Sequence, residues 1–515
     1  MRGTERAAGP GGRRANAAAI AGRRNTQMPT TTVRSSATTS VSSAAAAHGA
    51  PRKAIARAGF PSAAAVTASS PSQWQARRSC GGHGGAVAMA AAAGDASSGS
   101  KPQDVIFVSA EVAPWSKTGG LGDVVGGLPV EMAKRGHRVM TVAPRYDQYS
   151  DAWDTSVVAE VMGEKVRYFH TSKKGVDRVF VDHPLFLAKV QGKTGAKLYG
   201  NKSGADFSDN QKRFRIFCEA AIEAARVLPF SYGEAATFIA NDWHSALVPV
   251  LIRDVYKPRG EFTDAKVAFC VHNIAFQGRF WDADWKSLAL PEASKSKFAF
   301  EDGFPKVFDE AMPADEAEQD MDDSGKTYKK LNWMQAGFIA SDKNITVSPN
   351  YAEEVVLNES GGVELNGVIK QNGGIEGIVN GMDTDDWNPA IDKYLATNYG
   401  PSSVVEGKAA AKQALQAELG LDVEDDIPII GFIGRLEEQK GIDILLSAIP
   451  EITKKNKCQA VVLGTGKKKI EAAVKELDNE CPNARGVVKF SAPLAHLIIA
   501  GADYIVIPSR FEPCG

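Results

Sequence analysis

From Asp104 onward, short runs rich in Val, Ile and Phe alternate with amphipathic stretches of helical period. This alternation predicts an α/β fold with a parallel sheet flanked by helices, because strands buried on both faces read as nearly continuous apolar runs. The strands expected in this series are 105–110, 138–143, 179–181, 237–240, 266–271 and 344–347. The helices expected beside them are 124–135, 210–227, 245–255 and 328–340.

The alternation loosens after the turn signal Asn380-Gly381-Met382-Asp383, where Pro389, Gly400 and Pro401 break the pattern. It then restarts. The elements expected in the second series are strands 429–433, 460–463, 487–490 and 504–507, with helices 442–453, 468–477 and 494–500. Because the loosened segment separates two complete series of strands and helices, we predict two α/β domains with a crevice between them. One long sheet is the alternative.

The predicted boundaries divide the chain into four parts. They are a leader at 1–100, an N-terminal domain at 101–385, a linker at 386–425 and a C-terminal domain at 426–515. The last part contains fewer βα units than a sheet of this kind usually has, so we interpret that domain as incomplete.

The first 100 residues hold eleven Arg and one Lys against only Glu5 and Asp95, in a background of Ala, Ser, Thr and Gly. Such a segment cannot bury a core, and its composition is typical of an organelle transit peptide. A disordered arm or an upstream translation artefact is the alternative. Removing these 12 basic and 2 acidic residues from the totals of 60 and 61 leaves 48 basic and 59 acidic residues, a net charge of −11.

Composition also excludes several classes. The whole chain has a net charge of −1, without the basic excess of a general nucleic-acid binder. No stretch approaches the roughly 18 to 20 uninterrupted apolar residues of a membrane span. Five of the six cysteines lie beyond the leader without a C-x-x-C pair, so neither a zinc knuckle nor a disulfide framework is expected. We expect buried thiols, with Cys514 as the exception.

The first candidate loop is KTGGLGD, from Lys117 to Asp123, between an expected strand and an expected helix. Glycines let the backbone approach a ligand, free N–H groups at a helix start attract phosphate, and Lys117 adds positive charge. A glycine turn needed only for packing is the alternative. A dinucleotide fingerprint is excluded because Val125 stands where its third glycine belongs, and the GKT strings at Gly192 and Gly325 lack the earlier glycine of a P-loop.

The second cluster follows two expected strands, in NDWH at 241–244 and VHNIAFQG at 271–278. Residues just past the carboxyl ends of parallel strands face the ligand crevice, so Asp242, His244, His272 and Asn273 are expected there. His272 is suited to hydrogen-bond a sugar hydroxyl. The alternative is that these residues cap helices or satisfy buried backbone groups.

The third loop, GRLEEQKG at 434–441, places Arg435 and Lys440 around a helix start. Two cations and free donors suit a leaving diphosphate, because negative charge builds on its bridging oxygen as the bond breaks. Surface salt bridges with Glu437 and Glu438 are the alternative.

Two further loops have the same layout of strand, loop and helix. In LGTGKKK, Gly464 and Thr465 are placed to line a nucleoside. In PSRFEPCG, Glu512 occupies the corresponding position after the last expected strand, although a lone Glu is usually solvated.

Taken together, the motifs resemble those of one enzyme family. KTGGLGD, NDWH, VHNIAFQGRF, NWMQAGFIASDKNITVSPNYAEE, IVNGMD, GRLEEQKG, LGTGKKK and PSRFEPCG occur in the order in which starch and glycogen synthases carry them. The resemblance runs from about Asp104 to the last residue. The stretch RYDQYSDAWDTSV is similar to the granule-bound starch synthases of plants and green algae, which fits a leader for the plastid.

The resemblance implies a retaining glucosyltransferase of the GT-B type, which moves glucose from ADP-glucose to the non-reducing end of an α-1,4-glucan on the starch granule. It implies no metal and no cofactor, and no nucleic-acid or membrane partner is expected. The residues implied to bind ADP-glucose are Lys117, Gly119, Gly120, Asp123, Asn273, Arg435, Lys440, Gly464 and Thr465. The residues implied to act in catalysis are Asp242, His272, Glu512, Arg435 and Lys440.

Within these sets, the resemblance assigns individual roles. Arg435 and Lys440 bind the phosphates, while Asp242 and His272 lie near the transferred glucose. Glu512 holds the glucose or supports positive charge at its anomeric carbon. Closure of the two domains brings the half-sites together and excludes water.

The family pattern continues past EPCG with a second glutamate seven residues after the first, a glycine loop and further helices. We therefore interpret the chain as a fragment and expect weak or no transferase activity from its 515 residues. A non-catalytic granule-binding protein with a degenerate donor site is the alternative. A phosphorylase is disfavoured because no pyridoxal lysine motif is found.

Overall fold

The structure is a computed structural model that describes residues 101–514 except 191–197, 203–204, 231, 303–327 and 359. The predicted leader at 1–100 and the GKT strings at Gly192 and Gly325 lie outside the described residues. In the part of the chain that is described, no helix has both the length and the apolar character needed to cross a membrane.

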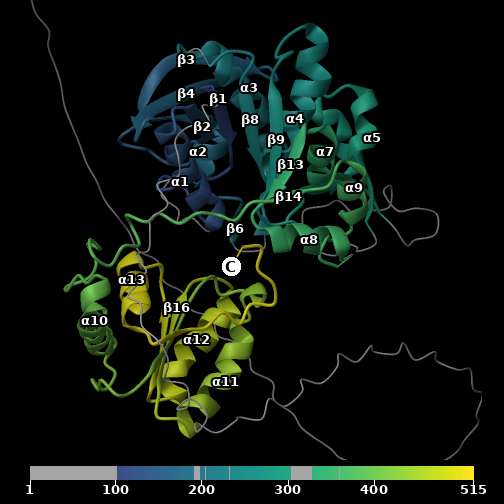
Figure 1. Cartoon of the computed structure of the whole chain (residues 1–515). Coiled ribbons are helices and arrows are strands. Elements are labelled where there is room, and N and C mark those ends of the chain that lie inside the picture. The colour runs from purple at the N-terminus through teal and green to yellow at the C-terminus, as the bar shows by residue number, and fades with distance from the viewer. Residues whose placement is uncertain are drawn as a thin grey trace, which may run out of the picture. The chain divides into compact units, whose positions relative to one another are not determined.

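A nine-stranded sheet occupies the first part of the chain (Figure 1). Its strands are β1 (Asp104–Val108), β2 (Arg138–Pro144), β3 (Trp153–Val161), β4 (Glu164–Lys173), β5 (Val176–Asp182), β8 (Thr237–Asn241), β9 (Lys266–Val271), β13 (Lys343–Thr346) and β14 (Glu376–Gly377). Their order is β14-β13-β9-β8-β1-β2-β5-β4-β3. The strands from β14 to β5 are parallel, which confirms the predicted parallel sheet, while β4 and β3 add an antiparallel edge that the sequence did not predict.

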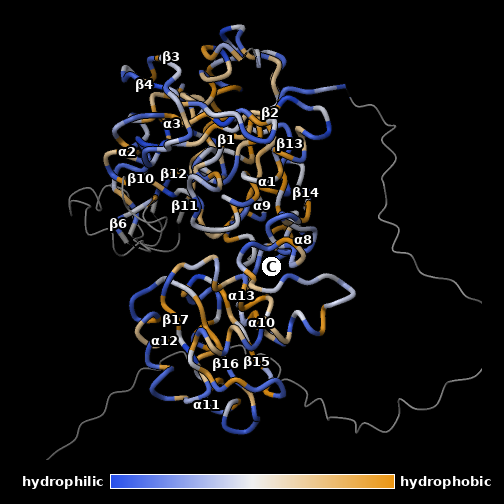
Figure 2. The backbone as a smooth tube through the Cα atoms, turned by 90° about the vertical axis from the view of Figure 1, so that its left-hand side faces the viewer, coloured by the Kyte–Doolittle hydropathy of each residue, from blue (hydrophilic) through white to orange (hydrophobic). Residues whose placement is uncertain are grey.

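Helices cover both faces of this sheet. They are α1 (Gly120–Lys134), α2 (Pro184–Val190), α3 (Asn210–Val227), α4 (Leu247–Leu251), α5 (Lys295–Phe298), α7 (Trp333–Ala340), α8 (Pro349–Leu357) and α9 (Asn366–Gln371). Successive residues of β1 point to opposite faces. Ile106 shares a core with Phe214 of α3, whereas Phe107 shares another with Val125 of α1. Figure 2 shows these hydrophobic segments gathered in the interior.

Three helices in this part differ from their predicted extents. The helix expected at 124–135 spans Gly120–Lys134, so the last four residues of the predicted KTGGLGD loop form its first turn. The helix expected at 328–340 begins only at Trp333, because Tyr328–Asn332 form β12 between β10 (Arg279–Trp281) and β11 (Ala299–Asp302). Asn332 caps α7, since its Oδ1 accepts the backbone N–H of Gln335 at 3.0 Å. The helix expected at 245–255 is divided into a 3₁₀ turn, α4 and a π-helical turn at Ile252–Tyr256.

The second series forms a four-stranded parallel sheet in the order β17-β16-β15-β18. Its strands are β15 (Ile429–Ile433), β16 (Gln459–Gly464), β17 (Ala484–Val488) and β18 (Tyr504–Ile505). The strand predicted at 487–490 is displaced, and Phe490 is 84% exposed instead of buried. The strand predicted at 504–507 is shorter than expected.

Four helices cover this sheet, two on each face (Figure 1). They are α11 (Ile442–Lys455) and α12 (Lys468–Glu480) on one face, and α10 (Val404–Leu419) and α13 (Ala492–Gly501) on the other. α10 falls within the predicted linker at 386–425, yet its fully buried Leu415 belongs to the same core as Ile498 of α13.

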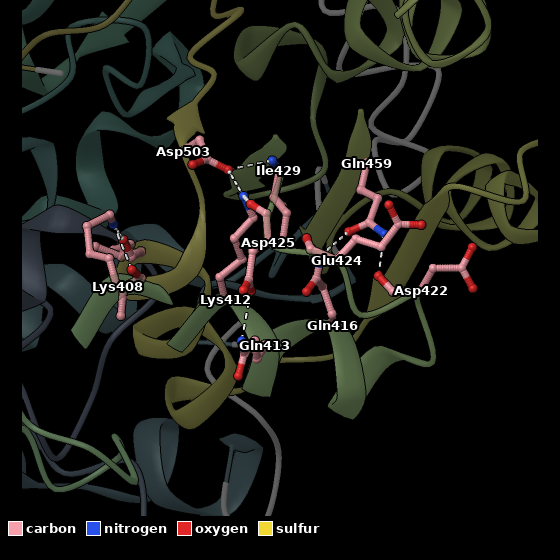
Figure 3. Close-up of polar contacts among 12 residues, drawn as sticks. Lys408, Lys412, Gln413, Gln416, Asp422, Glu424, Asp425, Ile429, Gln459 and Asp503 are labelled. Atoms are coloured by element: carbon pink, nitrogen blue, oxygen red, sulfur yellow. Dashed lines mark hydrogen bonds and ion pairs between the residues drawn. The ribbon is translucent and has the colours of Figure 1, made fainter. Parts of the chain in front are cut away.

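Polar contacts fasten α10 to the second sheet (Figure 3). Gln416 donates to the carbonyl of Glu424 at 3.0 Å and to Oε1 of Gln459 at 2.9 Å. The buried ammonium of Lys412 pairs with Asp503 at 3.0 Å. These contacts make α10 part of the helical layer on this sheet, and the domain boundaries themselves stay predictions.

Candidate active site

The first group of site residues lies where the strand order of the nine-stranded sheet reverses. From β1 the chain builds β2 and β5 on one side, and β8, β9 and β13 on the other, so β1 and β8 are neighbours that are not consecutive. Open α/β sheets bind ligands outside the carboxyl ends of strands at such a switch point. The KTGGLGD loop follows β1, and Asp242 follows β8.

The glycines of the KTGGLGD loop are of two kinds: one is required by packing, and two lie beside open space. A Cβ on Gly122 would lie 3.1 Å from the carbonyl oxygen of Ser116, so packing explains that glycine. A Cβ on Gly119 or Gly120 would meet nothing within 4 Å, so the space beside them is open to a ligand. Gly119 precedes α1 and provides no side-chain cap, which leaves the first N–H groups of the helix available. Lys117 pairs with Asp123 at 2.7 Å, and both side chains remain exposed.

Asp242 joins the ends of β8 and β9. Its Oδ1 accepts the backbone N–H of His272 at 2.7 Å and that of Asn273 at 3.4 Å, while its own N–H donates to the carbonyl of Cys270 at 2.8 Å. The backbone of Asp242 has φ of 56°, a strained conformation for a residue with a side chain. Burial raises the pKa of Asp242 to about 7, which suits a group that changes protonation near neutral pH.

His272 lies beside Asp242 and is held in one orientation by Asn241. The amide nitrogen of Asn241 donates to the carbonyls of Val108 and Ile239, so its Oδ1 faces His272 Nε2 at 3.0 Å. Burial lowers the pKa of His272 to about 4. The neutral ring therefore donates from Nε2 and keeps Nδ1 as an acceptor, which suits a hydroxyl partner.

His244 does not reach the crevice as expected. Its ring stacks on the rings of Trp243 and Tyr199, with centroid distances of 4.0 and 4.4 Å, and its Nδ1 is buried without a hydrogen-bond partner among the described residues. Burial lowers its pKa well below the usual value, so the ring is neutral. The strand-end rule failed here because the 3₁₀ turn at Trp243–Ser245 directs this side chain into the core.

Two further residues of this group were missed in the sequence. Glu111, two residues past the serine that follows β1, is buried and contacts both Thr118 and Tyr199. The available signal was a carboxylate directly after an apolar strand. Tyr199 offered none, because it lies 88 residues away along the chain.

The second group lies at the switch point of the four-stranded sheet, between β15 and β18. Arg435 follows β15, and Glu512 follows β18. Lys440 donates to both carboxylate oxygens of Glu512, at 2.6 and 2.8 Å, and Ser509 donates to the same carboxylate. Arg435 pairs with Glu437 at 3.2 Å. One predicted alternative, a salt bridge to Glu437, therefore forms.

Close backbone contacts hold the loops after β15 and β16 together. A Cβ on Gly464 would lie 2.1 Å from the carbonyl oxygen of Gly434, so packing by itself requires glycine there. The carbonyl of Thr465 accepts the N–H of Leu436 at 2.9 Å, and Thr465 itself is exposed. Ligand binding by Gly464 and Thr465 stays a prediction, as do the roles of the other site residues.

Among the described residues, no group of three or more His, Cys, Asp or Glu side chains is arranged to hold a metal ion. The described residues thus include two separate charged, glycine-rich edges, each at the switch point of a parallel sheet.

Comparison with known families identifies the class. Residues 104–371 match the family described as starch synthase catalytic domain, and residues 427–515 match glycosyl transferases group 1. The chain is thus a glycosyltransferase, and its fold is of the GT-B type. More particularly, it belongs to the starch synthase family.

The relatives support that assignment. Granule-bound starch synthase 1 from Manihot esculenta is 54% identical over 80% of this chain and 67% of its own length, and that from Pisum sativum is 55% identical with the same coverage. The catalytic domain of starch synthase IV from Arabidopsis thaliana, bound to ADP and acarbose, is 30% identical with a TM-score of 0.66, covering 81% of this chain and 80% of that one. The first two relatives are named chloroplastic/amyloplastic, which supports a plastid location.

Proposed function

We propose that this chain transfers glucose from ADP-glucose, with retention of configuration, to the non-reducing end of an α-1,4-glucan, and that it makes amylose at the starch granule. Two comparisons support the proposal. The structural neighbour is bound to ADP and acarbose, and the relatives at 54% and 55% identity are named granule-bound starch synthases.

The observation that carries the proposal is the pairing of Lys440 with Glu512 at the switch point of the second sheet. When the bond between glucose and diphosphate breaks, negative charge grows on the phosphate oxygens and positive charge on the anomeric carbon. Lys440 and Arg435 stabilise the first charge. The carboxylate of Glu512 supports the second charge or holds the glucose.

The loops of the first sheet supply the remaining contacts. Lys117 and the N–H groups in the first turn of α1, which begins at Gly120, bind the sugar nucleotide. Asp242 and the Nδ1 acceptor of His272 hold hydroxyls of the transferred glucose. The predicted approach of the two groups on closing would exclude water and so protect the donor from hydrolysis.

The test measures two quantities on the 515-residue chain: ADP-glucose binding by calorimetry and glucose incorporation from labelled ADP-glucose into amylopectin. Binding of ADP-glucose together with measurable incorporation is the result that supports the proposal. Retention on starch granules without any affinity for ADP-glucose would contradict the proposal and favour a non-catalytic granule-binding protein.

A further inference from the structure

A buried carboxylate stands behind the KTGGLGD loop. Glu111 is 2% exposed and accepts three hydrogen bonds: from the backbone N–H of Thr118, from the Thr118 hydroxyl and from the Tyr199 hydroxyl, each at 2.5 Å. Thr118 lies between Lys117 and Gly119, so the bond from its backbone N–H fixes the main chain where the loop turns toward α1, and the bond from its hydroxyl fixes its side chain.

The third bond ties the loop to the other side of the switch point. Tyr199 donates its hydroxyl to Glu111 and stacks its ring on His244, which follows β8. The contacts therefore run from the loop after β1, through Glu111 and Tyr199, to the residues after β8. This arrangement also gives His244 a role, as the surface against which Tyr199 is held.

A loop of this composition needs such support. Glycine loses more conformational freedom on ordering than any other residue, and Gly119 and Gly120 are adjacent. A loop that becomes ordered only when ligand arrives would lose that free energy from binding, whereas a loop already held avoids the loss. Charged acceptors form the stronger hydrogen bonds, so a buried carboxylate is an effective anchor.

We propose that Glu111 and Tyr199 are positioning residues for the donor: they hold Thr118, and through it Lys117 and Gly119, in the conformation that binds the sugar nucleotide. Neither residue need touch the donor. Burial raises the pKa of Glu111, and the hydrogen bonds from Thr118 and Tyr199 oppose that rise, as expected where they stabilise the ionised form. The inference rests on the proposed function, because it assumes that a sugar nucleotide binds this loop.

Two variants test the proposal against a matched control. Tyr199→Phe and Glu111→Gln each remove part of the anchor with little change in shape. Tyr232→Phe removes the same kind of bond elsewhere, since Tyr232 donates its hydroxyl to Asp177 at 2.9 Å. Thermal unfolding then measures how much stability each change costs without reference to the donor.

The first readout is hydrogen exchange of the amides at 117–120, which needs no ligand. We expect exchange about tenfold faster in Tyr199→Phe and Glu111→Gln, and unchanged in Tyr232→Phe. The second readout is the dissociation constant for ADP-glucose, expected to rise about tenfold in the first two variants only. Affinity for a glucan without a nucleotide should stay the same in all three.

Wild-type exchange and wild-type donor affinity in both Tyr199→Phe and Glu111→Gln would overturn the proposal. Equal losses of donor affinity in Tyr232→Phe would also overturn it, because they would reduce the effect to general destabilisation. If the unsubstituted chain does not bind ADP-glucose, the proposed function fails, and the exchange measurement still decides whether Glu111 and Tyr199 hold the loop.

Discussion

The ammonium of Lys440 lies 2.6 Å and 2.8 Å from the two carboxylate oxygens of Glu512, although the residues are 72 positions apart. The pair joins the loop after β15 to the loop after β18, and its side chains are 23% and 20% exposed. A partly exposed pair of this kind contributes little to stability by itself. Because the pair lies at the switch point of the second sheet, we interpret it as part of the donor site and not as a device for stability.

Replacing Lys440 with Gln should therefore weaken donor binding more than folding. We expect the dissociation constant for ADP-glucose to rise by about tenfold or more, because one charge-assisted contact to a diphosphate is worth about 1.5 to 3 kcal/mol. Calorimetry with ADP-glucose measures the effect. Lys457→Gln is the matched control, since Lys457 pairs with Glu424 in the same part of the chain and is 70% exposed. Unchanged affinity for ADP-glucose in Lys440→Gln would contradict the assignment of Lys440 to the phosphates of the donor.

Gly120 and Gly122 should respond in opposite ways to alanine. Gly120→Ala places its Cβ in open space at the start of α1, so thermal stability should be kept or rise slightly, while the methyl group obstructs a phosphate at the helix start and raises the ADP-glucose dissociation constant about tenfold. Gly122→Ala brings its Cβ within 3.2 Å of Lys117 Cα and should destabilise the fold by about 1 kcal/mol or more. Thermal unfolding and calorimetry on both variants decide. Full donor affinity in Gly120→Ala would argue against a ligand at this loop.

The sequence predicts best what local patterns control. β1 and β9 were found because buried parallel strands give continuous apolar runs. β3 was missed because its residues alternate irregularly between exposed and buried, and its pairing with β4 depends on a long, bulged hairpin. β12 was missed because it pairs with β10 and β11, which come earlier in the chain and are not its immediate neighbours in sequence.

The same division holds for the site. Strand-end loops identified Asp242, His272 and Arg435 as candidates, and the structure places all three at carboxyl edges. The direction of each side chain could not be predicted in the same way, and the burial of His244 was missed for that reason. Partners such as Tyr199 for Glu111 come from distant parts of the chain, so no local pattern reveals them.

Gln416 should matter for the stability of the second sheet and its helices. The side chain is fully buried and donates to Glu424 and Gln459 (Figure 3), so Gln416→Ala leaves two acceptors unsatisfied and also creates a cavity. We expect a loss of about 2 to 3 kcal/mol in the free energy of unfolding. Gln413→Ala, on the exposed side of the same helix, should change it by less than about 0.5 kcal/mol. Chemical denaturation compares the two, and similar small effects would show that α10 is only loosely attached.

Asp242 should make the protein less stable as pH rises toward neutrality. In the unfolded chain its carboxyl ionises near the ordinary value of 3.8, whereas in the folded protein burial raises the pKa to about 7. Between these values the folded state holds the proton more tightly, so its stability falls as pH rises through the window and levels off above about pH 7.

Asp242→Asn keeps an oxygen that can accept the N–H groups of His272 and Asn273 but carries no charge. Its stability advantage over the unsubstituted protein should be small near pH 4 and grow by about 2 to 4 kcal/mol up to pH 7, with no further change above it. Thermal unfolding at a series of pH values measures this difference, and glucose transfer should fall in the same variant because the titrating carboxyl is lost. A difference in stability that does not depend on pH would mean that the Asp242 carboxyl is solvated, and would remove the physical basis for placing it beside the transferred glucose as a group that titrates near neutral pH.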